Sequence, residues 1–291
     1  MRAFVVFLLF LTSSVVAQPV EPVLAQARAN KTPLLDTLKE LVSIESGSRD
    51  AEGLARLADL IAAKLKGLGA AKVELVEPFD VYKMEDTPDT IGKMVRATFN
   101  GKGKKKIMLI AHMDTVYPRG MLEKQPFRID GERAYGLGIS DDKQGVALIL
   151  HTVAMLRALG FSDFGTLTVL INGDEEISSP GSRALLTRLG AEHDATLSFE
   201  ASAASAAMAQ HAQGIYRELG MTLVVDKVAE GGGTDAAFAA LKTQNAVVER
   251  FGLRGFGAHS SNDEYVLISS IEPRLYLAAR MIMDLSRDKV R

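Results

Sequence analysis

The chain of 291 residues contains no cysteine. This absence excludes disulfide bonds, thiolate metal ligands and a cysteine nucleophile. Any metal site must therefore use histidine, aspartate and glutamate, which suit zinc, manganese or cobalt better than soft metals. The formal net charge is only −2, and no long basic block offsets it. The composition therefore argues against nucleic acid as a partner.

The sequence also lacks an apolar run of the ~20 residues that a membrane-spanning helix needs. The run Ala3–Leu11 is shorter, follows an arginine, and is succeeded by Val15 and Ala17, which fit the small-residue pattern of a cleavage site. We expect residues 1–17 to be a secretory signal peptide, with an uncleaved membrane anchor as the alternative. The mature chain would then begin at Gln18, be secreted or periplasmic, and have no stable membrane association.

Beyond this segment the pattern is that of one α/β domain. Short apolar runs alternate with segments of helical periodicity, which predicts a three-layer α/β/α fold around a mostly parallel sheet. Residues 18–30 are expected to be a loose leader, and residues 31–291 to form the domain. The basic cluster Lys102–Lys106 is expected to be a solvated hairpin turn rather than a binding surface. Strands are expected at 73–76, 94–99, 107–111, 166–172, 195–199, 221–225 and 246–248, and the stretch 117–135 is expected to be a loop.

Acidic and imidazole side chains recur just after the expected strands. They are His112, Asp141, Glu175, Glu176, Glu200 and His259. In an open α/β sheet the carboxyl ends of the strands form the ligand site, so these groups are expected to converge there. Four converging carboxylates would repel one another unless cations neutralised them. Two imidazoles and three carboxylates, one of them bridging, would satisfy two divalent ions and leave one carboxylate as a base.

Each of these residues also has an ordinary structural explanation. Asp141 fits a helix cap, Glu175 and Glu176 fit a solvated turn, and His259 fits a loop histidine. The stretch Gly231–Asp235, GGGTD, fits a glycine turn or an anion-binding loop. The arrangement as a whole favours the metal site. Within it, Asp114 stands two residues beyond His112, where it can hold the second ring nitrogen.

The motifs resemble a known family, the co-catalytic zinc exopeptidases. This family includes glutamate carboxypeptidase of the carboxypeptidase G type, acetylornithine deacetylase, succinyl-diaminopimelate desuccinylase and aminoacylase. The motifs stand in family order over nearly the whole mature chain, and they are most similar to those of the glutamate carboxypeptidase branch. They are AHMDTVY at 111–117, GLGISDDKQG at 136–145, NGDEE at 172–176, SFE at 198–200, GGGTDAAFAAL at 231–241 and GFGAHSSNDEYV at 255–266.

The resemblance implies a zinc-exopeptidase-like catalytic domain with two zinc ions, for which cobalt or manganese could substitute. His112 and Glu200 would bind one zinc, Glu176 and His259 the other, and Asp141 would bridge both. Asp114 would orient His112, and Glu175 would be the general base for a metal-bound hydroxide. The substrate would be a small peptide or N-acyl amino acid, with the carboxylate at its end placed by Gly231, Gly232, Gly233 and Thr234.

The chain departs from this family in one respect. Members of the branch carry an inserted lid or dimerisation domain after the position of Glu200, but only thirty residues separate Glu200 from Gly231 here. A small domain needs on the order of 100 residues, so the lid is expected to be missing between about 201 and 210. In the family the lid supplies a histidine, a substrate-binding arginine and the dimer contacts, so the dimer interface is expected to be lost.

Three interpretations of function follow. The first is a dizinc carboxypeptidase that cleaves the amide bond to a C-terminal residue, with glutamate as the expected residue. The second is a lidless metal-binding scaffold with weak or no catalysis. The third is an N-acyl-amino-acid deacylase. The presence of Glu175 favours an enzyme, because replacement of the base would have favoured the scaffold.

Overall fold

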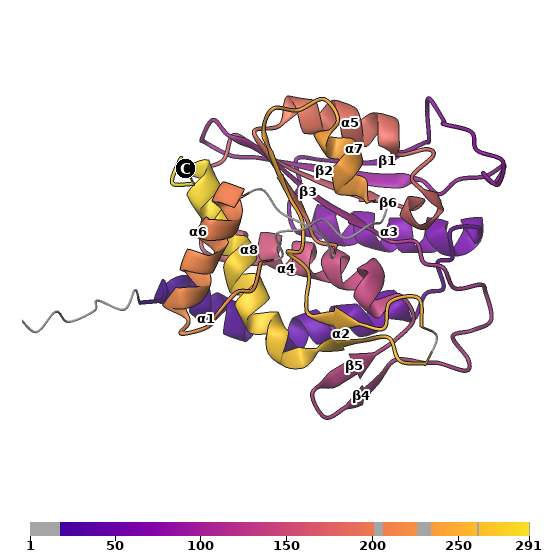
Figure 1. Ribbon diagram of the computed structural model, residues 1–291, viewed down its shortest axis with the longest axis horizontal. Coiled ribbons are helices and arrows are strands. Elements are labelled where there is room, and N and C mark those ends of the chain that lie inside the picture. The colour runs from indigo at the N-terminus through magenta and orange to yellow at the C-terminus, as the bar shows by residue number, and fades with distance from the viewer. Residues whose placement is uncertain (1–17, 201–205, 226–233, 261, 291) are drawn as a thin grey trace, which may run out of the picture.

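The computed structural model describes residues 18–200, 206–225, 234–260 and 262–290 (Figure 1). The α-helices are α1 Glu21–Ala29, α2 Lys31–Val42, α3 Ala51–Gly67, α4 Gln144–Ala158, α5 Arg183–Glu192, α6 Ala206–Glu218, α7 Asp235–Ala240 and α8 Ile271–Ser286. The strands are β1 Lys72–Val76, β2 Met94–Asn100, β3 Lys106–His112, β4 Arg128–Asp130, β5 Arg133–Tyr135, β6 Thr166–Asn172, β7 Ala195–Ser198, β8 Ala246–Val248, β9 Gly255–Phe256 and β10 Tyr265–Leu267. Short helical turns lie at η1 Ile139–Lys143, η2 Glu175–Ile177 and η3 Ile268–Ser270.

The central sheet has six strands in the order β1-β2-β6-β3-β7-β8. Strands β6, β3, β7 and β8 run parallel to one another, whereas β1 and β2 form an antiparallel edge. The expected mostly parallel sheet is therefore confirmed. Because the parallel strands share one direction, their carboxyl ends meet at one edge of the sheet.

Helices cover both faces of this sheet, so the three-layer expectation is also confirmed (Figure 1). Helices α5 and α7 lie on one face, where Leu186 and Ala239 pack against Met108 and Ile110 of β3. Helices α3, α4 and α8 lie on the other face, where a larger apolar core forms. Strand β3 is buried throughout except at Lys106 because side chains pack on both of its faces.

A second, smaller sheet lies beyond α2, with the order β4-β5-β10-β9. Its strands β9 and β10 are joined by the loop that carries His259, and β10 also pairs with β5. The stretch 117–135, expected to be only a loop, therefore contains the hairpin formed by β4 and β5. The small sheet holds the His259 loop against the end of the domain that contains η1.

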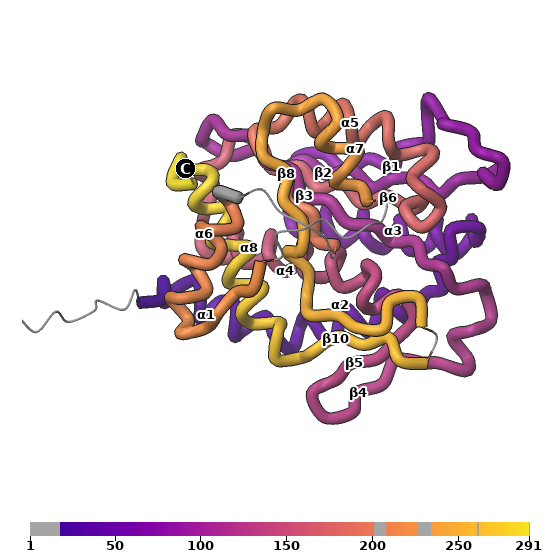
Figure 2. Tube along the Cα trace, in the orientation of Figure 1, coloured from indigo at the N-terminus to yellow at the C-terminus, as the bar shows by residue number. Residues whose placement is uncertain are grey.

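The expectation of a loose leader over residues 18–30 is wrong for most of that segment. Residues 21–29 form α1, which buries Val23, Leu24 and Ala27 in the main core. The helix lies beside α8 (Figure 2), and the preceding Val20 N–H donates a 2.8 Å hydrogen bond to the Tyr276 hydroxyl of α8. This short helix is stable because the C-terminal helix covers its apolar residues. Tertiary packing of this kind cannot be predicted from the local sequence.

Two smaller expectations are also wrong. Lys102–Lys106 is not a hairpin turn, because β6 lies between β2 and β3 in the sheet. Residues 221–225 form no strand, and Val224 is 80% exposed, so no neighbouring strand buries this segment within the described chain. None of the helices in the described ranges is long and apolar enough to cross a membrane. Residues 1–17, where the signal peptide is expected, lie outside the described residues.

Candidate metal centre and active site

Three parallel strands deliver polar side chains to the same edge of the central sheet. His112 is the last residue of β3, Glu200 follows β7 directly after Phe199, and Glu175 and Glu176 form η2 after β6. The apolar strand residues before them are buried on both faces, so the chain can expose these polar groups only where each strand ends. The sequence pattern therefore places chemistry at the carboxyl edge, as expected.

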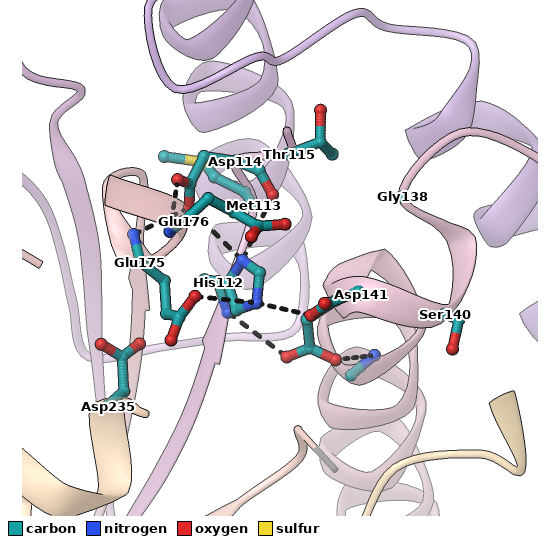
Figure 3. A network of polar contacts seen from close by, with 12 residues as sticks. His112, Met113, Asp114, Thr115, Gly138, Ser140, Asp141, Glu175, Glu176 and Asp235 are labelled. Carbon is teal, nitrogen blue, oxygen red and sulfur yellow. Dashed lines mark hydrogen bonds and ion pairs between the residues drawn. The ribbon is translucent and has the colours of Figure 1, made fainter. Parts of the chain in front are cut away.

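Asp141 reaches the same edge from the turn that precedes α4. The turn begins at Gly138, whose φ of +68° is left-handed and where an added Cβ would lie 2.3 Å from Thr115 Cγ2. Asp141 itself has non-helical backbone angles, and the peptide bond between Asp141 and Asp142 is cis. Asp141 is more than a helix cap, because its carboxylate faces His112 (Figure 3) and also lies 3.1 Å from His259 Nε2.

The described residues form two ligand clusters that share Asp141. One contains His112, Asp141 and Glu200, and the other contains Asp141, Glu176 and His259. Within each cluster the potential ligand atoms lie within 4.8 Å of one another. His112 Nε2 is 3.0 Å from Asp141 Oδ1, and His259 Nε2 is 3.1 Å from both Asp141 Oδ2 and Glu176 Oε2.

Asp114 lies behind this pair of clusters and is fully buried. Its Oδ1 is 3.3 Å from His112 Nδ1, so an Nδ1–H tautomer leaves Nε2 free to face Asp141. Its two carboxylate oxygens also accept hydrogen bonds from the backbone N–H groups of Glu175 and Glu176, at 3.1 Å each. Asp114 therefore connects the end of β3 to the turn η2 (Figure 3).

Glu175 lies beside the clusters rather than within them. Its Oε2 is 3.9 Å from His112 Nε2, and the residue is only 8% exposed. Burial raises the pKa of the Glu175 carboxyl well above its ordinary value, and nearby Glu200 and Asp235 raise it further. A buried carboxyl of raised pKa next to a ligand cluster is typical of a proton-transferring group.

The donor set fits divalent cations. Glu176 Oε1 and Glu200 Oε2 are buried and have no hydrogen-bond partner among the described residues. Burial raises the pKa of Glu176 to about 8, with Asp141 among the neighbours that add to the shift. Burial likewise raises the pKa of Glu200, and Asp142 adds to it. Burial makes the charge of these carboxylates unfavourable, and each is clustered with histidine nitrogens, so they are suited to bind hard or borderline cations.

The glycine-rich stretch is only partly described. Gly231, Gly232 and Gly233, expected to place the substrate carboxylate, lie outside the described residues. Thr234 is the N-cap of α7, where its hydroxyl accepts the Ala236 N–H at 3.1 Å and donates to Glu249. The Thr234 side chain is thus engaged with its own helix and with Glu249.

The buried carboxylates near the clusters that were not predicted as site residues include Asp235 and Glu264. Asp235 accepts hydrogen bonds from Asn172 and Ser179, at 3.0 and 2.8 Å, and lies beside Glu175 (Figure 3). Glu264 accepts hydrogen bonds from the turn that carries Asp141. Both residues stand inside motifs that the sequence does show, but neither follows a strand, so the strand-end pattern could not select them.

An α/β sheet with two histidine–carboxylate clusters that share one aspartate at its carboxyl edge is the architecture of a metal-dependent hydrolase. Comparison with protein families agrees with this class. A model described as peptidase family M20/M25/M40 matches residues 108–203 and 191–284, which together make up more than half of the chain. The chain belongs to this family of metal-dependent peptidases, and the resemblance seen in the motifs is confirmed.

Individual relatives support the same assignment. Carboxypeptidase G2 of Pseudomonas sp. (strain RS-16) is 32% identical over 409 aligned positions, which cover 96% of each chain. The alignment is longer than this chain, so the relative contains a long stretch without a counterpart here. Succinyl-diaminopimelate desuccinylase of Gluconobacter oxydans is 35% identical over 120 residues, which cover 40% of this chain and 29% of the relative.

A solved structure shows the fold alone. A tripeptidase from Staphylococcus aureus subsp. aureus Mu50 superposes with a TM-score of 0.67 at 16% identity. The superposition covers 89% of this chain and 99% of the tripeptidase. At 16% identity, this similarity supports the architecture of the domain and nothing about its activity.

Proposed function

We propose that the chain is a two-metal amide hydrolase that removes a C-terminal residue, glutamate by preference, from a small peptide or N-acyl amino acid. The observation that carries the proposal is the pair of ligand clusters joined by Asp141. His112 and Glu200 would hold one metal, and Glu176 and His259 the other. Zinc is the proposed metal, because mixed histidine and carboxylate ligands without thiolates suit it.

When bound, two such ions supply Lewis acidity, which polarises a carbonyl and lowers the pKa of a coordinated water. The chain supplies the proton transfer. Glu175 Oε2 lies on the side of His112 that faces Asp141, so it can take a proton from the attacking water. The same atom would then deliver the proton to the leaving amide nitrogen. The buried position of Glu175 keeps bulk water from competing for this proton.

Asp114 is proposed to act through its neighbours. It holds the His112 ring by the nitrogen that does not face the clusters, and it fixes the backbone that carries Glu175 and Glu176. The stretch Gly231–Thr234 is proposed to receive the substrate carboxylate through its backbone N–H groups. Preference for glutamate is supported by the similarity of the motifs to the glutamate carboxypeptidase branch.

The second candidate is an N-acyl-amino-acid deacylase, which recognises the acyl group, such as a succinyl group, rather than a C-terminal glutamate. Its support is the similarity to succinyl-diaminopimelate desuccinylase. The chemistry at Glu175 would be the same, because both substrates present an amide bond. The two candidates differ only in which side of that bond is recognised.

The missing lid is part of the proposal. The stretch that carboxypeptidase G2 has and this chain lacks is proposed to be the inserted lid, absent between about 201 and 210. A family lid histidine and arginine would be missing with it, and so would the dimer contacts. We therefore expect an assembled metal centre with slow turnover and weak selectivity. A metal-binding scaffold without turnover is the limiting case.

We also propose that the chain is exported, with residues 1–17 as its signal peptide. The support is the short apolar run followed by the small-residue cleavage pattern. Sequencing the N-terminus of the protein recovered from outside the cytoplasm tests this directly. The expected first residue is Gln18, and a recovered chain that begins with Met1 would contradict cleavage.

The function is tested by hydrolysis of an N-acyl glutamate by zinc-loaded residues 18–291. An N-acyl diaminopimelate serves as the competing substrate for the second candidate. Slow turnover that is abolished both by a chelator and by Glu175→Gln is the expected result. Turnover that survives either treatment would contradict the mechanism, and turnover only of the diaminopimelate derivative would favour the deacylase.

A further inference from the structure

The carboxylate of Glu264 collects four hydrogen bonds although it stands outside the ligand clusters. The residue is 3% exposed. Its Oε2 accepts the Tyr117 hydroxyl at 2.6 Å and the Gly138 N–H at 3.0 Å. Its Oε1 accepts the N–H groups of Ser140 at 2.7 Å and Asp141 at 3.1 Å. The carboxylate is thus saturated by protein donors, so binding of a metal to it would require these bonds to break.

The four donors and Glu264 itself come from three of the segments that carry candidate ligand residues. Tyr117 lies on the loop that leaves β3 after His112. Gly138 and Asp141 belong to the turn before α4, and Glu264 ends the loop that carries His259. Glu264 is therefore a single buried side chain whose hydrogen bonds connect these three segments.

The loop around His259 lies at the surface, where residues 256–259 are exposed. The His259 side chain is 55% exposed, and its backbone is left-handed with φ of +63°. His112, in contrast, is fully buried at the end of a central strand. The position of His259 relative to Asp141 thus depends on how firmly its loop is attached at the buried Glu264.

Asp141 depends on Glu264 from the other side. Its carboxylate must face both histidines at once, at 3.0 and 3.1 Å. The backbone around it is held by N–H groups that point to Glu264 and not to a regular helix. Small shifts of this turn would move the shared ligand of both clusters together.

We propose that Glu264 is a positioning residue that fixes the bridging Asp141 and the histidine of the second metal, His259, in the geometry that binds two ions. This proposal rests on the metal centre described under the proposed function. Replacing a residue that hydrogen-bonds a metal ligand commonly lowers metal affinity by ~10–100-fold. Glu264 differs from Asp114, because Asp114 holds His112 and η2 whereas Glu264 holds Asp141 and the His259 loop.

The negative charge and both oxygens of Glu264 are needed for this role. A glutamine keeps the shape but offers only one acceptor oxygen, and its NH2 group would face N–H or O–H donors. At least one pair of donors would then lose its acceptor inside a buried site. Glu264→Gln is therefore the sharpest test, because the replacement changes the hydrogen bonding and almost nothing in volume.

Two control variants separate this role from general stability. Tyr117→Phe removes one donor and leaves the three backbone donors in place. Asp284→Asn replaces a buried carboxylate of α8 that contacts His211 and Arg280 at 3.0 and 3.2 Å, away from the ligand clusters. Zinc affinity is measured by competition with a chromophoric chelator, and the visible spectrum of the cobalt-loaded protein reports ligand geometry.

We expect Glu264→Gln to lose ~10–100-fold in affinity for one or both zinc ions and to show an altered cobalt spectrum. Tyr117→Phe should lose only a few-fold on the same scale, and Asp284→Asn should bind zinc as the wild type does even where its melting temperature falls. Glu264→Gln with affinity within twofold of the wild type and an unchanged cobalt spectrum would overturn the proposal. An equal loss in Asp284→Asn would also overturn it, because the effect would then be general destabilisation. A wild-type chain that binds no zinc would remove the metal centre itself, whereas failed hydrolysis with zinc bound would leave the role of Glu264 intact.

Discussion

At the scale of single residues, the site depends on carboxylates that cannot easily be charged without cations. Glu175, Glu176 and Glu200 are buried close together, and burial raises the pKa of each of them. His112 opposes this trend, since its hydrogen bonds to Asp114 and Asp141 outweigh burial and raise its pKa well above 6.5. Protons and metal ions therefore compete for the same atoms, and metal binding should release protons.

The role of Glu175 leads to the first prediction. Glu175→Gln removes the proton acceptor but leaves His112, Glu176 and Asp141 in place. Hydrolysis should fall by ~10²–10⁴-fold in kcat, which is the usual contribution of a general base. Zinc content, measured on the same sample, should stay at the wild-type level. A variant that lost its zinc together with its activity would show that Glu175 is a ligand instead.

Asp114 leads to the second prediction. In Asp114→Asn one carboxylate oxygen becomes an NH2 group, so it meets either His112 Nδ1–H or a backbone N–H as donor against donor. Zinc affinity should fall by ~10–100-fold in a chelator competition assay. Ser48→Ala is the matched control, because it removes the 2.8 Å hydrogen bond that the Ser48 hydroxyl donates to Asp114, and its longer 3.4 Å contact with the Thr115 carbonyl, but leaves the Asp114 carboxylate in place. A loss in Ser48→Ala as large as that in Asp114→Asn would argue against a special role for the His112 contact.

The site residues that are most readily predicted from the sequence are those that lie next to the ends of apolar strands. His112 ends an apolar strand, and Glu176 and Glu200 closely follow apolar strands. A polar residue directly after an apolar run is visible in the sequence. Glu264 follows the polar residues Asn262 and Asp263 and looks like part of an exposed turn. Its burial comes from the turn before α4, which is far away in the sequence, so no local pattern could reveal it.

At the scale of elements, a partly buried histidine joins three helices of the main core. His151 of α4 accepts a hydrogen bond from the Thr37 hydroxyl of α2 at 2.9 Å. Its Nδ1 is 2.9 Å from Asn30 Oδ1, at the junction of α1 and α2. Because the Asn30 amide nitrogen donates to the Gln26 carbonyl, Oδ1 is the acceptor here, and the pattern fits a neutral ring with Nδ1–H.

The third prediction concerns stability against pH at this junction. Burial, with a contribution from Lys64, lowers the pKa of His151 from 6.5 to about 4. Between these values only the unfolded chain binds the proton, so the free energy of unfolding should fall as pH drops from 6.5 to 4. The loss should be at most about 3 kcal/mol and should level off below pH 4.

The measurement is denaturant unfolding of the metal-free protein, so that release of metal at low pH does not contribute. His151→Gln cannot titrate, and it should lose less stability than the wild type between pH 7 and pH 4.5. His211→Gln, on the partly exposed face of α6, serves as the control that keeps His151. Equal pH slopes in the wild type and His151→Gln would contradict the assignment.

The elements also show where local patterns succeed and fail. Helix α8 is an element that the local pattern can predict, because its apolar face repeats at helical spacing over about four turns. The antiparallel edge was not expected, because the position of β6 between β2 and β3 depends on pairing between residues distant in the chain. Helix α1 was missed for the same reason, since its apolar residues gain their stability from α8.

At the scale of the whole molecule, the proposed metal centre can be assembled from the elements that this chain contains. The candidate ligands of both clusters come from the end of β3, the residues just after β6 and β7, the turn before α4, and the loop between β9 and β10. The stretch that carboxypeptidase G2 has and this chain lacks is therefore not needed to supply any of these candidate ligands. Loss of the proposed lid should therefore affect turnover and selectivity more than metal binding.

The proposal that five residues of this chain hold two metal ions is tested by native mass spectrometry of the zinc-loaded protein. The wild type should gain the mass of two zinc ions per chain. His259→Ala should bind one zinc ion, because the cluster of His112, Asp141 and Glu200 keeps all of its residues. The two-metal centre would be contradicted if the wild type bound no zinc, or if His259→Ala still bound two ions.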